Sequence, residues 1–215
     1  MKLVANNIYK KIRGKEILKD INLTLESGRI YGFVGRNGSG KTMLFRALSG
    51  LMKTNEGTVS LDGQVLHKNF NVLPSLGIVL ENAGLYPNMT GMDNLRYLAS
   101  MKKMIGDEEI SQAMIRVGLD PKDKRVYRKY SLGMKQRLHI AQAVMERPDI
   151  IMLDEPTNSL DEFGVEEIRN IILEEKERGA LVLLASHNKD DIHKLVDKLY
   201  RIENGRVSEE KEERV

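Results

Sequence analysis

Three short runs of the chain are apolar at nearly every position, and they lie at Ile30 to Val34, Ile150 to Leu153 and Leu181 to Ala185. Runs of this length without a polar face are typical of strands that are buried on both sides. Stretches with helical spacing alternate with them, and we predict helices from Lys41 to about Ser49, from Ser131 to about Glu146 and from Glu162 to Arg178. Strands that alternate with helices predict an α/β fold with a parallel sheet between helices.

Further strands are predicted at Leu3 to Tyr9, Ile17 to Leu25, Thr58 to Leu61 and Leu76 to Leu80. In the second of these, every other position from Ile21 is apolar, and Ile17 is expected on the same face. Near the C-terminal end, Asn204-Gly205 predicts a tight hairpin.

The middle of the chain differs, because roughly 50 residues there carry no strand signal. Thr90 to Asp93 is like a capping box, and Leu95, Leu98 and Met101 follow at helical spacing. A second helix is predicted from Glu108 to Val117. We interpret this stretch as a helical subdomain, at about residues 85–145, inserted into the α/β core.

Composition narrows the possible functions. The 34 basic and 31 acidic residues interleave and leave a formal net charge of only +3, so we expect no nucleic-acid partner. The absence of cysteine excludes disulfides, Cys-ligated zinc and thiol catalysis. No apolar run approaches the roughly 20 residues that span a bilayer, so any membrane role requires a partner.

The main chemical motif is Gly35-Arg36-Asn37-Gly38-Ser39-Gly40-Lys41-Thr42, which fits the pattern G-x-x-x-x-G-K-[ST]. Glycines let backbone N–H groups wrap closely around phosphates, and the following helix presents its positive end to the anion. We expect Lys41 to reach the β- and γ-phosphates of ATP and the Thr42 hydroxyl to bind Mg²⁺.

Two carboxylates, Asp154 and Glu155, end the apolar run that begins at Ile150. We expect Asp154 to hold Mg²⁺, through water, and Glu155 to polarise the water that attacks the γ-phosphorus. His187 follows the next apolar run and should emerge at the same sheet edge, where it would sense the γ-phosphate and orient the water or Glu155.

A competing pattern points to guanine nucleotides. Asn188-Lys-Asp-Asp191 fits N-x-x-D, and Asp161-Glu-Phe-Gly164 fits D-x-x-G, as in GTPases. However, Asp161 does not end a strand, and Asn188 is at a position typical of a helix start. We therefore favour ATP over GTP as the nucleotide.

With these residues in place, the chain resembles an ATP-binding cassette (ABC) ATPase over essentially its whole length. Tyr130-Ser131-Leu132-Gly133-Met134-Lys-Gln-Arg137 is similar to the family signature L-S-G-G-Q-x-Q-R. The resemblance implies a single domain over residues 1–215. Its phosphate-loop NTPase core would have a mostly parallel sheet, an N-terminal antiparallel β subdomain and the inserted α-helical subdomain.

The resemblance also implies a head-to-tail dimer, either a homodimer or a heterodimer. Each ATP would lie between one subunit's phosphate loop and the partner's Ser131 and Gly133. The segment ending in Asp161 resembles the loop that couples the two sites.

Four positions depart from the family pattern. Leu132 and Met134 replace a signature glycine and glutamine, and Glu81 stands where most members have a Mg²⁺-binding glutamine. A carboxylate at position 81 can still bind the ion, so we expect altered metal affinity. Ile12 stands where an aromatic ring usually stacks on adenine, so adenine contact is weaker or comes from Tyr9 or another chain.

Among subfamilies, the chain is most similar to the ATPase subunits of bacterial exporters of peptide antibiotics such as bacitracin and lantibiotics. That implies membrane-spanning permease subunits as partners, docked around Glu81 to Tyr97, and a cytoplasmic location on the inner face of the cell membrane. An importer ATPase and a soluble ABC ATPase of DNA repair or translation stay as alternatives. A phosphate-loop kinase would lack Ser131, Gly133 and His187. The cargo is not encoded in these motifs.

Overall fold

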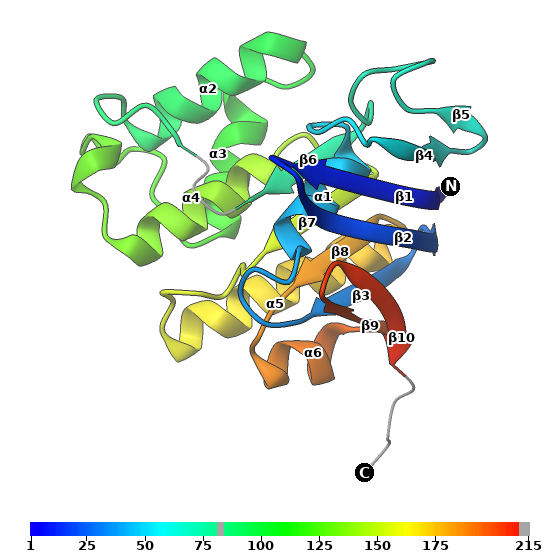
Figure 1. Cartoon of the computed structure of the whole chain (residues 1–215). Helices are drawn as coiled ribbons and strands as arrows, with labels where there is room; N and C mark the ends of the chain where they lie inside the picture. Colours follow the sequence, from blue (N-terminus) through cyan, green and yellow to red (C-terminus); the bar gives the residue numbers. More distant parts are fainter. Residues whose placement is uncertain (81–83, 211–215) are drawn as a thin grey trace.

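The computed structural model describes residues 1–80 and 84–210, which form two sheets and a set of flanking helices (Figure 1). The first sheet is antiparallel, with the strand order β2-β1-β4-β5. Its strands are β1 (Lys2–Ile12), β2 (Lys15–Glu26), β4 (Glu56–Leu61) and β5 (Gln64–Val65).

The alternating pattern of β2 is correct from Ile21 onward, and Ile17 also packs against that core, but the strict alternation breaks between them, at Leu18. Leu18 is buried and Ile17 is only half-buried. The pairing of β1 with β2 shifts register in this stretch, and Asp20 has a left-handed φ of 52°. An irregularity of this kind changes which residues face the core, and no alternation rule anticipates it.

The second sheet is larger, with the order β10-β9-β3-β8-β7-β6. All neighbours in it are parallel except β10, which pairs with β9 in the Asn204-Gly205 hairpin predicted from the sequence. The strands are β3 (Arg29–Val34), β6 (Leu76–Val79), β7 (Ile150–Asp154), β8 (Leu181–Ala185), β9 (Lys198–Glu203) and β10 (Arg206–Glu210).

The position of β7 and β8 inside the large sheet explains why their sequences lack a polar face. Every residue of both strands is buried, and successive side chains enter opposite layers of the core. Ile150 and Met152 pack towards helix α1 (Lys41–Ser49) and the antiparallel sheet, whereas Ile151 and Leu153 pack towards the other helices. The large sheet is therefore covered on both faces.

The remaining helices are α2 (Gly91–Lys102), α3 (Asp107–Arg116), α4 (Leu132–Val144), α5 (Glu162–Glu177) and α6 (Lys189–Leu195), with a 3₁₀ turn at Tyr127–Lys129. Helices α2 to α4 gather on one side of the molecule, and α3 contacts both of the others (Figure 1). None of the helices in the described ranges is long and apolar enough to cross a membrane.

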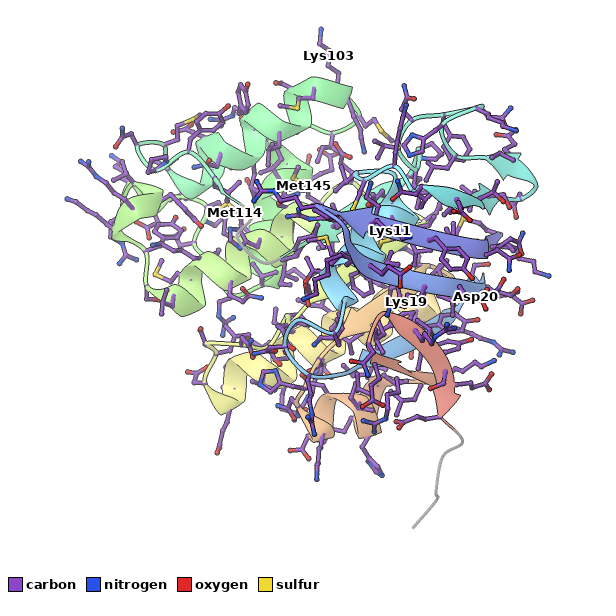
Figure 2. All side chains as sticks on the ribbon, viewed as in Figure 1. Lys11, Lys19, Asp20, Lys103, Met114 and Met145 are labelled. Atoms are coloured by element: carbon purple, nitrogen blue, oxygen red, sulfur yellow. The ribbon has the colours of Figure 1, made fainter. Side chains whose placement is uncertain are left out.

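Helix α2 begins as predicted, because the Thr90 hydroxyl accepts a hydrogen bond from the Asp93 N–H. The expected apolar face is wrong at Met101, which is 65% exposed. Ala99 is buried instead. Figure 2 shows Lys103, just after this helix, projecting into solvent, while the buried Met114 lies among the helices.

Candidate functional site

The predicted phosphate loop connects β3 to α1 at the carboxyl edge of the parallel sheet. Gly38 and Gly40 have φ values of 78° and 115°, which favour glycine strongly. A Cβ on Gly35 would overlap the Ile202 carbonyl oxygen and lie 2.7 Å from the Ser39 hydroxyl oxygen. Glycine is thus required here by backbone conformation at two positions and by close packing at the third.

Several donors of this loop are oriented for an anion. Gly40 precedes α1, and no side chain caps this helix, so the N–H groups of its first turn are available to phosphate oxygens. The Ser39 hydroxyl is buried without a hydrogen-bond partner in residues 1–80 and 84–210. The Lys41 ammonium is largely buried and donates to the Gly35 carbonyl at 2.7 Å, which holds it inside the loop.

The two predicted Mg²⁺ ligands of the core meet directly. The Thr42 hydroxyl donates to Oδ2 of Asp154 at 2.5 Å, although the residues are far apart in the sequence. The large sheet brings them together, because β7 lies next to β8, which pairs with β3. A hydroxyl and a carboxylate oxygen are hard donors that suit Mg²⁺.

In the described part of the chain, no cluster of acidic side chains adds further Mg²⁺ ligands to Thr42 and Asp154. Within the described ranges, no group of three or more His, Asp or Glu side chains is arranged to hold a metal. Mg²⁺ commonly uses one or two protein ligands together with water and substrate phosphates, so Thr42 and Asp154 fit it. The third predicted ligand, Glu81, lies outside the described residues.

Glu155 and His187 are paired. Nδ1 of His187 lies 2.8 Å from Oε2 of Glu155, and the same oxygen accepts the His187 N–H at 3.3 Å. Glu155 has a left-handed φ of 54° immediately after β7, and its own N–H donates to Ala185 at the end of β8. The adjacent strands therefore position both residues at one edge.

Gln136 has a role in this geometry that its position in the sequence does not reveal. Its side-chain amide donates to the backbone carbonyls of Glu155 and Pro156 at 3.2 and 2.9 Å. This links α4, which begins in the signature segment, to the segment that carries the acid. Its place in the signature segment marked Gln136 as a residue of interest, but only the fold shows which residues it contacts.

Ser131, Gly133 and Asp161 form a second group. The Ser131 hydroxyl caps α4 by accepting the Met134 N–H at 3.1 Å, and the Asp161 carboxylate caps α5 by accepting the Gly164 N–H at 2.9 Å. A Cβ on Gly133 would lie 3.0 Å from the Ser159 carbonyl oxygen. No hydrogen bond or ion pair in the described part of the chain joins Ser131 or Asp161 to the phosphate loop.

The guanine-reading alternative does not fit the structure. Asn188 caps α6, and Asp191 is completely buried. Its carboxylate accepts hydrogen bonds from Thr157 at 2.6 Å, Arg169 at 2.8 Å and Ser186 at 3.2 Å. A carboxylate that is fully engaged inside the protein is not available to a base.

Comparisons with known proteins agree with this geometry. Residues 18–158 match the family described as ABC transporter. The uncharacterized ABC transporter ATP-binding protein YybJ of Bacillus subtilis is 46% identical over 201 residues, which cover 94% of this chain and 92% of that protein.

Two further relatives have names that include a cargo. The bacitracin transport ATP-binding protein BcrA of Bacillus licheniformis is 37% identical over 208 residues, covering 96% of this chain and 68% of that protein. The lantibiotic transport ATP-binding protein SrtF of Streptococcus pyogenes is 33% identical over 210 residues, covering 98% of this chain and 90% of that protein.

Solved structures show the same fold. The dimeric structure of MJ0796, a bacterial ABC transporter cassette, superposes with a TM-score of 0.86 at 24% identity, covering 97% of this chain and 98% of that one. The dimeric post-hydrolysis state of the same cassette, bound to ADP and Pi, gives a TM-score of 0.87. The expected fold of a phosphate-loop core with one antiparallel and one mostly parallel sheet is therefore confirmed.

Proposed function

This chain belongs to the ABC transporter family of ATP-binding proteins, and on that premise we propose that it is the ATP-hydrolysing subunit of a membrane exporter. One observation carries the hydrolytic part of the proposal. The Thr42–Asp154 contact ties the phosphate loop to the end of β7, and the next residue, Glu155, contacts His187. Phosphate donors, candidate metal ligands and a candidate base thus share one sheet edge.

We assign the roles as follows. The loop from Gly35 to Thr42 binds the phosphates of ATP, with Lys41 neutralising their charge. Thr42 and Asp154 would hold Mg²⁺, which would neutralise phosphate charge when it is bound. Glu155 accepts a proton from the attacking water, and His187 holds Glu155 and the water in position.

The group formed by Ser131, Gly133 and Asp161 would complete the ATP site of a partner subunit. Ser131 already directs its oxygen to the start of α4, and the positive end of that helix attracts phosphate. We propose that Ser131 and Gly133 contact the ATP bound to a partner cassette, and that Asp161 couples the two sites. A dimer is the arrangement seen for MJ0796, which has the same fold.

The names of BcrA and SrtF, which give bacitracin and lantibiotic transport, support a cargo of peptide antibiotics or similar compounds, and we propose export as the direction. We propose that a permease docks on residues 81–97 and places the chain on the inner face of the membrane. Within the described part of this segment, Tyr86 and Tyr97 are 50% and 42% exposed. Their rings pack edge to face, with 5.0 Å between the ring centroids. Buried Asn94 fixes the backbone at Tyr86. Its side-chain oxygen accepts the Tyr86 N–H, and its side-chain NH₂ donates to the Tyr86 carbonyl.

A pull-down from membranes tests this proposal. The tagged full chain should capture a polytopic permease, and the variant Tyr86→Ser/Tyr97→Ser should capture several-fold less. Ile115→Ser is the control, since Ile115 is 64% exposed but lies on α3. Capture of ribosomes or DNA in place of a permease would overturn the transporter assignment.

A further inference from the structure

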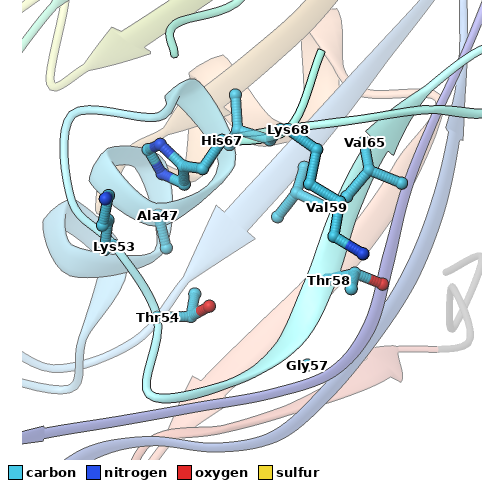
Figure 3. Close-up of a pocket in the computed structure, with 10 residues that line it drawn as sticks. Ala47, Lys53, Thr54, Gly57, Thr58, Val59, Val65, His67 and Lys68 are labelled. Atoms are coloured by element: carbon cyan, nitrogen blue, oxygen red, sulfur yellow. The ribbon is translucent and has the colours of Figure 1, made fainter. Parts of the chain in front are cut away.

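A pocket of about 230 Å³ lies between the last turn of α1 and the β4–β5 hairpin (Figure 3). Its lining extends from Ala47 of α1, through the loop after that helix, to Lys68 beyond β5. No phosphate-loop residue contributes to it. Lys41 and Ala47 are about 9 Å apart along the helix axis, so the pocket is separate from the candidate nucleotide site.

His67 carries the strongest indication of a ligand. Both ring nitrogens are buried, and neither makes a hydrogen bond with any of the described residues. A neutral imidazole has one N–H donor and one acceptor nitrogen, and buried groups of this kind nearly always have a partner. The local backbone is fixed, because the His67 N–H donates to the Phe70 carbonyl at 2.6 Å. A bound group that pairs with the ring therefore stabilises the folded protein.

Lysine side chains border the same pocket from two sides. Figure 3 shows Lys53 and the His67 ring on the α1 side and the Lys68 amine on the β4 side. No lining residue is acidic, and neither lysine forms an ion pair within residues 1–80 and 84–210. Lys10 adds a third cation, since its ammonium donates to the Lys53 carbonyl at 2.6 Å. The lining itself thus carries two cations and no acid, which favours an anion.

The remaining polar groups are the hydroxyls of Thr54 and Thr58, which make no hydrogen bond with other described residues. Ammonium, hydroxyl and imidazole donors together match the oxygens of a phosphate group, for which lysine acts as a point charge. We infer that this pocket is a second phosphate site, which binds a small phosphate-bearing anion between Lys53, Lys68 and His67.

NMR of the histidine side chains tests this inference on the full chain. The protein has four histidines, so each imidazole can be assigned by single substitution. Inorganic phosphate is titrated at constant ionic strength with ADP saturating the nucleotide site. His187 then reports on the candidate nucleotide site, exposed His193 on non-specific effects, and His67 on the pocket. The expected result is a saturable shift of the His67 ring resonances.

Matched variants distinguish specific binding in the pocket from non-specific attraction of phosphate to positive charge. Lys53→Gln/Lys68→Gln should raise the apparent Kd at His67 at least tenfold, because both side chains are exposed and their loss leaves the fold intact. The control Lys122→Gln/Lys124→Gln removes two exposed lysines elsewhere and should change nothing. The inference is overturned if His67 moves no more than His193, if the lysine pair has no effect, or if acetate saturates the ring shift at the same concentration.

Discussion

Nδ1 of His187 lies 2.8 Å from Oε2 of Glu155, across the ends of two adjacent parallel strands. The histidine side chain is 66% exposed and the glutamate only 21%. The acid is therefore held beneath a ring that faces the open edge of the sheet. This geometry gives the candidate proton acceptor a partner that fixes its orientation, and the residue before it, Asp154, contacts Thr42 of the phosphate loop.

Removing the charge of the acid should stop turnover without stopping binding. Glu155→Gln keeps the shape but loses the proton acceptor, so phosphate release should fall at least ~100-fold. ATP binding should persist, and the ATP-bound dimer should accumulate in size-exclusion chromatography. Glu162→Gln, at the exposed start of α5, is the control. Normal ATP turnover in Glu155→Gln would refute the base assignment.

Lys41→Ala should abolish nucleotide binding. The ammonium is held inside the phosphate loop by the Gly35 carbonyl, and its loss removes the main positive charge of that loop. Binding of a fluorescent ATP analogue measures the effect, with exposed Lys124→Ala as the control. Wild-type affinity in Lys41→Ala would contradict the assignment of the loop.

Ser131 offers a way to separate helix capping from ATP contact. Ser131→Ala should cost about 1 kcal/mol in the free energy of unfolding, because the Met134 N–H loses its cap. Ser131→Asp restores the cap but places a negative charge against phosphate, so stability should recover while ATPase activity stays low. Denaturant unfolding and phosphate release measure the two effects. Full activity in Ser131→Asp would mean that Ser131 is only a cap.

Asp191 should be important for stability. Asp191→Asn removes the buried one of the two charge partners of Arg169, whose Nη2 lies 2.6 Å from the carboxylate, and leaves only the half-exposed Glu166. Breaking one side of a buried pair typically costs about 3–5 kcal/mol. Exposed Asp190→Asn is the control, and thermal or urea unfolding is the measurement. A difference below about 1 kcal/mol between the two variants would argue against a structural role for this cluster.

Acid should destabilise the protein partly through His139. Burial, aided by the nearby Lys135 charge, lowers the pKa of His139 below its ordinary value. The unfolded chain then binds more protons, so this contribution to stability is present above about pH 6.5 and declines as the pH falls through that value. His139→Gln should reduce the slope of unfolding free energy against pH between 7 and 5, whereas exposed His193→Gln should not. Equal slopes in the two variants would contradict the prediction.

Much of the fold was predictable because it follows from local rules. The predicted helix from Lys41 to Ser49 and the strand from Leu181 to Ala185 agree with α1 and β8 to the residue. In both cases the signal is strong, with a glycine-rich turn and a C-terminal glycine for α1, and an unbroken apolar run for β8. Met101 was misplaced, and the alternation of β2 breaks at Leu18, because the position of a neighbouring helix and a strand irregularity determine which side chains are buried.

The sequence by itself determined that the loop from Gly35 to Thr42 is the candidate phosphate site, since that motif is continuous and glycine is needed for its conformation. It also indicated that acids and a histidine follow buried strands. Only the tertiary structure decided which of these side chains touch. The Thr42–Asp154 and Glu155–His187 contacts depend on strand order in the sheet, which no local pattern encodes. The same holds for the pocket at His67, whose lining comes from a helix end and a hairpin brought together by packing.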